Sequence, residues 1–306
     1  MKVWKQILRA AGYFGIFLGT QVMAYIILSV ACSFIAAFRL GPLGLENPQA
    51  LIDNMMAMYT RYSIAGLIIN LILCFGVYLI MFKARKVNPL DQIDFKKTPG
   101  VFYPIGIIGG LGAGMFLNYV MAIIPIPESL MEGLYNALEF TIAPPLVLSI
   151  ITEIIVAPLL EEVVLRGLVF GRLNRAMPAI VAAIITSLIH GLLHGQLIWI
   201  IWAFFFSLFA TYLRIRCGSI IPCILYHMSA NAFAVFINYS GIQEHLSDPH
   251  VIVLIVLGAL LLVVFFLLAS IFGKKAKAEG KLKEPVLEEE ELLYARRKKP
   301  VNEVVL

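Results

Sequence analysis

Charged residues are scarce in this chain of 306 residues. Asp, Glu, Lys and Arg make up 14% of it, while hydrophobic residues make up 60% and the mean hydropathy is +0.89. A soluble domain carries about 25% charged residues. The composition therefore excludes an ordinary soluble domain and predicts an all-α fold, a polytopic membrane helical bundle.

Cysteine is rare as well. The four cysteines, Cys32, Cys74, Cys217 and Cys223, lie in or beside apolar runs and lack the paired spacing of a metal site. They are predicted to be small buried side chains rather than a disulfide framework. The net charge of +5 collects beside the apolar runs, so it predicts membrane topology and no nucleic-acid partner.

A convincing small-residue cleavage site is missing after the basic N-terminus. Lys2, Lys5 and Arg9 precede an apolar run that reaches Phe38, which predicts an uncleaved first span. Internal and inverted repeats are also missing, and this disfavours a secondary transporter.

Long apolar runs dominate what is present. A spanning helix needs about 20 such residues, and Gly195-Gln196 is the one plausible turn between two adjoining runs. About eight transmembrane helices are predicted, at 12–38, 63–82, 101–124, 141–161, 178–195, 197–213, 219–239 and 251–272.

The basic residues set the predicted orientation. Of the 24 Lys and Arg residues, only Arg39 and Arg61 fall on one side of the spans. The positive-inside rule then predicts a multi-pass cell-membrane protein with both termini cytoplasmic. The predicted parts are N-terminal helices at 1–140, a catalytic core at 141–239, a last span at 240–272 and a charged cytoplasmic tail at 273–306.

Ionisable residues inside apolar segments are functional candidates, because each is costly in a bilayer. Glu161 and Glu162 end the fourth run, and Arg166 follows Glu162 at the i, i+4 spacing that allows a pair on one helical face. Glu161 points about 100° away. We predict that Glu161 is the reactive group and that Glu162 and Arg166 support it.

Two further polar pairs share helical faces: His190 with His194, and His227 with Asn231. A carboxylate with imidazoles can bind a divalent metal that polarises water. It can also act alone, with Glu161 taking the proton of a water while a histidine or Asn231 stabilises the oxyanion. Either route hydrolyses an acyl bond, and a proton or ion pathway would use the same residue types.

Together these residues resemble the CPBP family of intramembrane proteases. That family includes the CAAX prenyl endopeptidases and the bacteriocin-processing or immunity proteins called the Abi family. The resemblance covers about 141–239. Three motifs carry it: Glu161-Glu162-x-x-x-Arg166-Gly167, then His194, then His227-x-x-x-Asn231.

The resemblance implies a role for each matched residue. Glu161 would activate the attacking water, His194 would orient it, and His227 with Asn231 would stabilise the oxyanion. If a metal such as zinc takes part, Glu161, His194 and His227 would be its ligands. The family usually has Phe four residues before its motif histidine, and here that position is His190, a possible additional site residue.

The implied function is an intramembrane endopeptidase acting on a membrane-associated peptide or protein, prenylated or not, within the lipid bilayer. A non-enzymatic immunity or membrane-peptide-binding protein and a proton-coupled transporter are the alternatives. One geometric condition follows from the orientation. A helix entering at 178 places His194 about 24 Å along its axis. Glu161, near the inner end of its own span, then reaches it only if the fourth helix continues through 168–170 inside the membrane, or if 172–183 lies partly outside the membrane. Trp199 and Trp202 are typical of an outer interface and favour the second arrangement.

Overall fold

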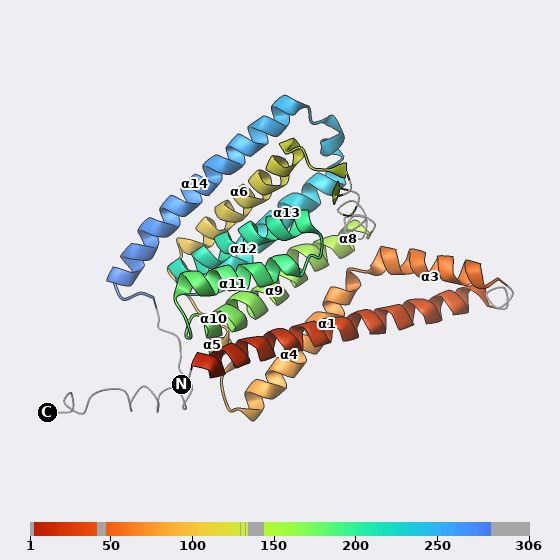
Figure 1. Ribbon diagram of the computed structural model, residues 1–306, viewed down its shortest axis with the longest axis horizontal. Helices are drawn as coiled ribbons and strands as arrows, with labels where there is room; N and C mark the ends of the chain where they lie inside the picture. Colours follow the sequence, from red (N-terminus) through yellow and green to blue (C-terminus); the bar gives the residue numbers. More distant parts are fainter. Residues whose placement is uncertain (1–2, 42–46, 129, 132, 134–143, 283–306) are drawn as a thin grey trace.

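The chain folds into a bundle made of helices. The computed structural model describes residues 3–41, 47–128, 130–131, 133 and 144–282, and every regular element in these ranges is helical. Most helices pack side by side, whereas α3 (Pro48–Tyr62) and the end of α1 (Val3–Leu40) extend beyond the others (Figure 1). The predicted all-α membrane bundle is confirmed.

Each of the eight predicted spans overlaps helical structure in the described ranges, and residues 141–143 of the fourth lie outside them. Six helices there are long and apolar enough to cross a membrane: α1, α4 (Ala65–Ala84), α6 (Phe102–Ile123), α12 (Leu197–Cys217), α13 (Ile221–Ser240) and α14 (Asp248–Ala278). The fifth predicted span is the shorter helix α11 (Ala179–Leu192). The predicted turn at Gly195 is present, with a positive φ of 74°.

The fourth predicted span does not end at 161. Helical structure runs through α8 (Leu146–Ser149), η1 (Ile150–Val156), α9 (Ala157–Glu161), η2 (Glu162–Val169) and α10 (Phe170–Leu173). The prediction ended it at the first charges, but these charges are neutralised inside the bundle and do not break the helix. The helix therefore continues through 168–170, as the first of the two arrangements requires, whereas the tryptophans had favoured the second.

Helix α3 was not predicted as a separate element. Asn47 caps it by accepting a hydrogen bond from the backbone N–H of Ala50, and Pro48 begins it. Its polar residues Gln49, Asp53 and Asn54 place it below the apolar content on which the search for spans relied. Two short elements complete the described chain, α5 (Pro89–Gln92) and η3 (Ile242–His245).

Burial in this bundle is inverted relative to a soluble protein. Large apolar side chains such as Phe38 (89% exposed) and Val147 (69% exposed) cover its outside, whereas Glu162 and Arg166 are completely buried. Exposed apolar surface on this scale marks an interaction with partners or with membrane. The inversion agrees with a bundle whose outer surface faces lipid.

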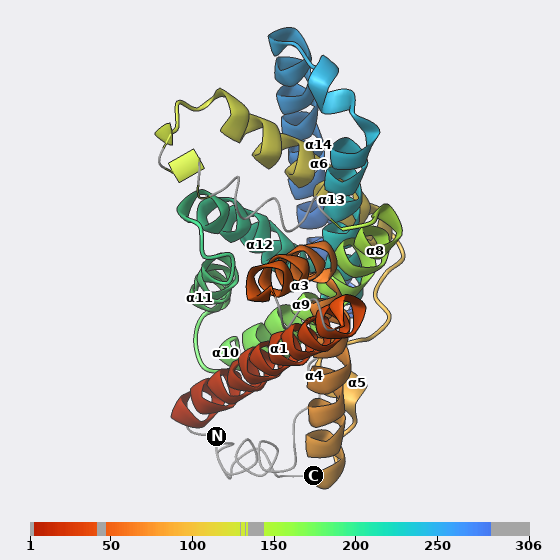
Figure 2. The same cartoon turned by 90° about the vertical axis from the view of Figure 1, so that its right-hand side faces the viewer.

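Helix α6 lies between α13 and α14 (Figures 1 and 2). Its glycines at 106, 110 and 114 recur every fourth residue and meet the α13 backbone at 222, 226 and 230, which have the same spacing. A Cβ built on Gly110 would lie 1.9 Å from the carbonyl oxygen of Tyr226. Such small residues let two membrane helices approach until their backbones touch, and this contact sets the position of the helix that carries His227.

A buried ion cluster ties the segment after α5 to the turn between α12 and α13. Asp94 pairs with Arg214 and, at 2.8 Å, with Lys96, while its carbonyl accepts a hydrogen bond from the backbone N–H of Ile220. Beside it, Ile93 lies 2.9 Å from where a Cβ of Gly167 would be. The glycine of the first motif therefore makes room for this segment under η2.

We predict that Gly110→Ala destabilises the protein far more than Gly76→Ala. The first Cβ would overlap backbone, at a cost of about 1–3 kcal/mol or more, whereas a Cβ on Gly76 meets nothing within 4 Å. Both substitutions gain the same helix propensity, so Gly76→Ala is a matched control. Thermal unfolding in lipid nanodiscs measures the difference, and equal midpoints for the two variants would contradict the close α6–α13 contact.

Candidate active site

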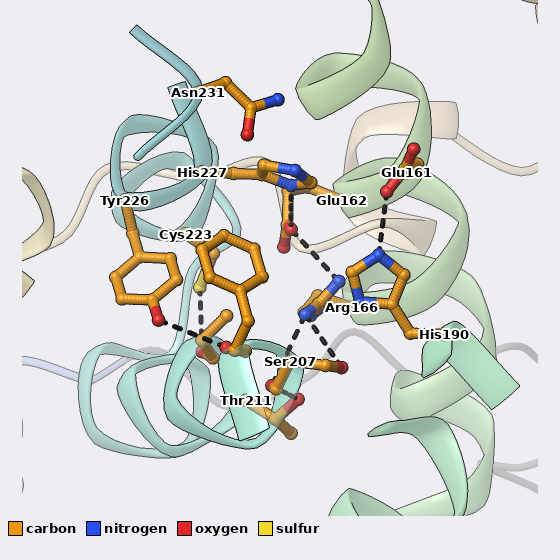
Figure 3. A network of polar contacts seen from close by, with 12 residues as sticks. Glu161, Glu162, Arg166, His190, Ser207, Thr211, Cys223, Tyr226, His227 and Asn231 are labelled. Carbon is orange, nitrogen blue, oxygen red and sulfur yellow. Dashed lines mark hydrogen bonds and ion pairs between the residues drawn. The ribbon is translucent and has the colours of Figure 1, made fainter. Parts of the chain in front are cut away.

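A fully buried charge cluster joins η2 to α12 and α13 (Figure 3). Glu162 Oε1 lies 3.0 Å from Arg166 Nη1 and 2.9 Å from His227 Nδ1. Arg166 Nη2 donates to the side-chain oxygen of Ser207 at 2.9 Å and to its carbonyl at 3.3 Å. The predicted Glu162–Arg166 pair is confirmed, and it holds three segments of the chain together.

Glu161 points to a different partner. Its Oε2 atom lies 2.9 Å from Nε2 of His190, and 20% of its side chain is exposed, against 0% for Glu162. Adjacent positions on a helix face about 100° apart, and this places the two carboxylates in different surroundings. Glu161 is therefore the accessible carboxylate of the pair, as predicted.

The side chain of Asn231 supplies a hydrogen bond that the backbone of the wide helical turn η1 lacks. In a π-helix the N–H of residue i bonds the carbonyl of residue i−5, and Ala157 bonds Thr152 in this way. The next partner of this series would be Pro158, which has no N–H, so the carbonyl of Glu153 would be left unpaired. Nδ2 of Asn231 donates to that carbonyl at 2.7 Å.

His194 lies just beyond α11, in the turn that leads to α12. Its ring stacks on Trp199 with centroids 4.9 Å apart, and its centroid is 5.5 Å from that of His190. The hydrogen bond of Glu161 goes to His190 rather than to His194. His190 lies on α11 one helical turn before His194, and its ring is the one within hydrogen-bond distance of the carboxylate.

A cavity of about 440 Å³ lies against Glu161, His190 and His194. The opposite lining comes from α1, from α3 and from the N-terminal end of α4, and it includes Gln21 and Tyr25. This volume falls within the range of ligand pockets, roughly 300–1,000 Å³. The cavity gives the exposed side of Glu161 an open space of the size of a ligand pocket.

The expected metal ligands Glu161, His194 and His227 are not brought together as a ligand set. Among the residues described here, no group of three or more His, Cys, Asp or Glu side chains is arranged to hold a metal ion. Nδ1 of His227 is directed at Glu162, and Nε2 of His190 is directed at Glu161. In this arrangement each of these two ring nitrogens is directed at a glutamate rather than at a shared metal position.

The family comparison covers this site. The family model described as "Type II CAAX prenyl endopeptidase Rce1-like" matches residues 143–233. The match covers 91 of the 306 residues, and over this stretch the chain is similar to the Rce1-like family. The resemblance read from the three motifs is thus confirmed, and it supports in general terms a CAAX-type endopeptidase embedded in the membrane. Searches of curated proteins and of solved structures found no match.

The Rce1-like region supplies Glu161 and the histidines, yet part of the site was missed from sequence. Ser207 holds the buried Arg166, and a serine in an apolar helix gives no periodic signal. Gln21 and Tyr25 come from the first span, where a glutamine among apolar residues was the available hint. His190, named only as an additional residue, is the direct partner of Glu161.

We predict that breaking the buried pair on one side destabilises the protein more than removing both charges. Glu162→Gln leaves Arg166 uncompensated, and losing one partner of a buried pair costs about 3–5 kcal/mol. Glu162→Gln with Arg166→Met removes both charges at similar volume and should restore much of the stability.

Thermal unfolding of the single and double variants in nanodiscs measures this coupling. Glu279→Gln removes a carboxylate from the exposed pair with Lys281 and serves as the control, with no change expected. A double variant that is less stable than Glu162→Gln alone would contradict the account.

Proposed function

We propose that the protein is an intramembrane endopeptidase that hydrolyses a peptide bond of a membrane-associated substrate, with a prenylated CAAX peptide as the first candidate. The observation that carries the proposal is that two adjacent carboxylates lie in different surroundings. Glu162 is buried against Arg166, while Glu161 faces a cavity with one oxygen held by His190. A lone accessible carboxylate in such a place suits general-base work.

In the proposed reaction Glu161 takes a proton from a water in the cavity. The hydroxide oxygen forms a bond to the scissile carbonyl carbon, and the carbonyl π electrons move to oxygen to give a tetrahedral oxyanion. Glu161 then passes its proton to the amide nitrogen as the C–N bond breaks. The products are a carboxylic acid and an amine, and Glu161 returns to its starting state.

The histidines have different proposed roles. His190 fixes the orientation of Glu161, and His194 faces the same cavity, where its ring can orient the water or the oxyanion. His227 and Asn231 do not line the cavity. His227 instead bonds Glu162, and Asn231 bonds the Glu153 carbonyl. Because neither residue lines the cavity, we propose that they position η1 and η2 rather than stabilise the oxyanion.

The membrane setting of this proposal rests on the sequence as well. We propose a multi-pass cell-membrane protein with both termini cytoplasmic, because 22 of the 24 Lys and Arg residues flank the spans on that side. The tail beyond 282 lies outside the described residues. The transporter alternative gains no support from the cavity, because Glu153 does not line it.

Cleavage of an internally quenched farnesylated CAAX peptide by the purified protein in nanodiscs tests the function. We expect Glu161→Gln to lose at least about 10²-fold in kcat, the lower range for a lost general base. His190→Phe installs the residue usual in the family and should lower kcat less, because Glu161 loses its partner but stays in place.

Gln49→Met, on the exposed side of α3, is the control and should cleave at the wild-type rate. If Glu161→Gln cleaves as fast as the wild type, the proposed chemistry is wrong. If the wild type binds the peptide without cleaving it, the binding or immunity alternative replaces the enzyme.

We also expect cleavage to survive metal chelation. The described donor groups are not arranged as a metal site, so 1,10-phenanthroline should inhibit no more than its non-chelating 1,7 isomer. Selective inhibition by the 1,10 isomer that zinc reverses would show that the histidines rearrange around a metal.

A further inference from the structure

Gln21 presents an unused hydrogen-bond acceptor to the cavity that contains Glu161. It lies on α1, outside the Rce1-like match, and lines the cavity together with Glu161 and His190. Its Oε1 atom is buried and has no hydrogen-bond partner. Buried polar atoms are nearly always paired in folded proteins, so this oxygen indicates a partner that is not part of the chain.

The helix that carries Gln21 is fixed in rotation. The hydroxyl of Thr20 donates to Oδ1 of Asn70 on α4 at 2.7 Å, and the hydroxyl of Tyr78 donates to the carbonyl of Tyr13 at 2.7 Å. Gly66 leaves a slot for the ring of Tyr25, since a Cβ there would lie 2.7 Å from it. These contacts hold the stripe of α1 at positions 17, 21 and 25 toward the cavity.

Hydrolysis within a membrane creates a need for such an acceptor. A substrate segment must be extended for Glu161 to reach its carbonyl, and extension frees main-chain N–H groups from helical hydrogen bonds. In an apolar environment each unpaired N–H is costly. Strand-like peptide recognition meets this need with acceptors along the binding wall, and Gln21 faces the space that the segment must occupy.

We propose that Gln21 binds the substrate main chain by accepting a hydrogen bond from a peptide N–H next to the scissile bond. This proposal rests on the proposed endopeptidase function. It makes α1 part of the active site. It also predicts that the enzyme prefers a substrate whose main chain is extended and keeps a free N–H at this position, whatever its side chains are. Its partner is an amide donor of the peptide rather than the prenyl group.

Backbone N-methylation of the substrate tests the assignment without altering the protein. The probe is the internally quenched farnesylated CAAX peptide, with a single N-methyl group placed in turn at each amide around the cleaved bond. With the wild type, one position should lower kcat/KM about tenfold, the value of one hydrogen bond. In Gln21→Met the unmodified peptide should show the same loss, and N-methylation at that position should add nothing.

The outcomes separate this proposal from the proposed function. Normal kcat/KM in Gln21→Met, or equal N-methyl effects in both proteins, overturns the role of Gln21 while cleavage by the wild type still stands. If the wild type does not cleave the peptide, binding affinity in nanodiscs is measured instead. Wild type and Gln21→Met are each tested with the unmodified and the N-methylated peptide. Additive effects there, or no binding at all, also overturn the role. Gln49→Met controls for the substitution itself.

Discussion

The buried pair of Glu162 and Arg166 is the interaction on which the rest of the site depends. Both side chains are fully buried, and one carboxylate oxygen lies near both the arginine and His227. A buried ion pair seldom adds net stability, but it strongly disfavours any packing that separates its members. Since Arg166 also binds Ser207, the pair fixes how η2, α12 and α13 meet.

This constraint explains how two adjacent glutamates come to lie in different surroundings. With Glu162 committed to the buried cluster, the helix turns Glu161 toward His190 and the cavity. The wide turns η1 and η2 flank α9, and irregular helix of this kind is frequent at functional sites. Asn231 compensates for the N–H missing at Pro158, so the third motif stabilises the helix that presents the first.

Much of this was predictable from sequence because the signals were local. Helix i, i+4 spacing predicted the Glu162–Arg166 pair, and apolar length predicted the spans. Contacts between distant segments were not predictable from sequence. That His190 rather than His194 bonds Glu161 depends on how α11 packs against α10 and η2, which continue the helix after Glu161. Likewise, α1 contributes Gln21 to the cavity because contacts with Asn70 and Gly66 fix the rotation of α1. No motif in the first span predicts these contacts.

The central claim is that Glu161 performs hydrolysis while Glu162 maintains the structure. The most direct measurement compares new peptide ends in membrane and secreted fractions from cells expressing wild type, Glu161→Gln or the double variant Glu162→Gln with Arg166→Met, at matched protein levels. The account predicts ends that appear with the wild type, disappear with Glu161→Gln although that protein stays folded, and persist in part with the double variant. Identical ends from wild type and Glu161→Gln would contradict it.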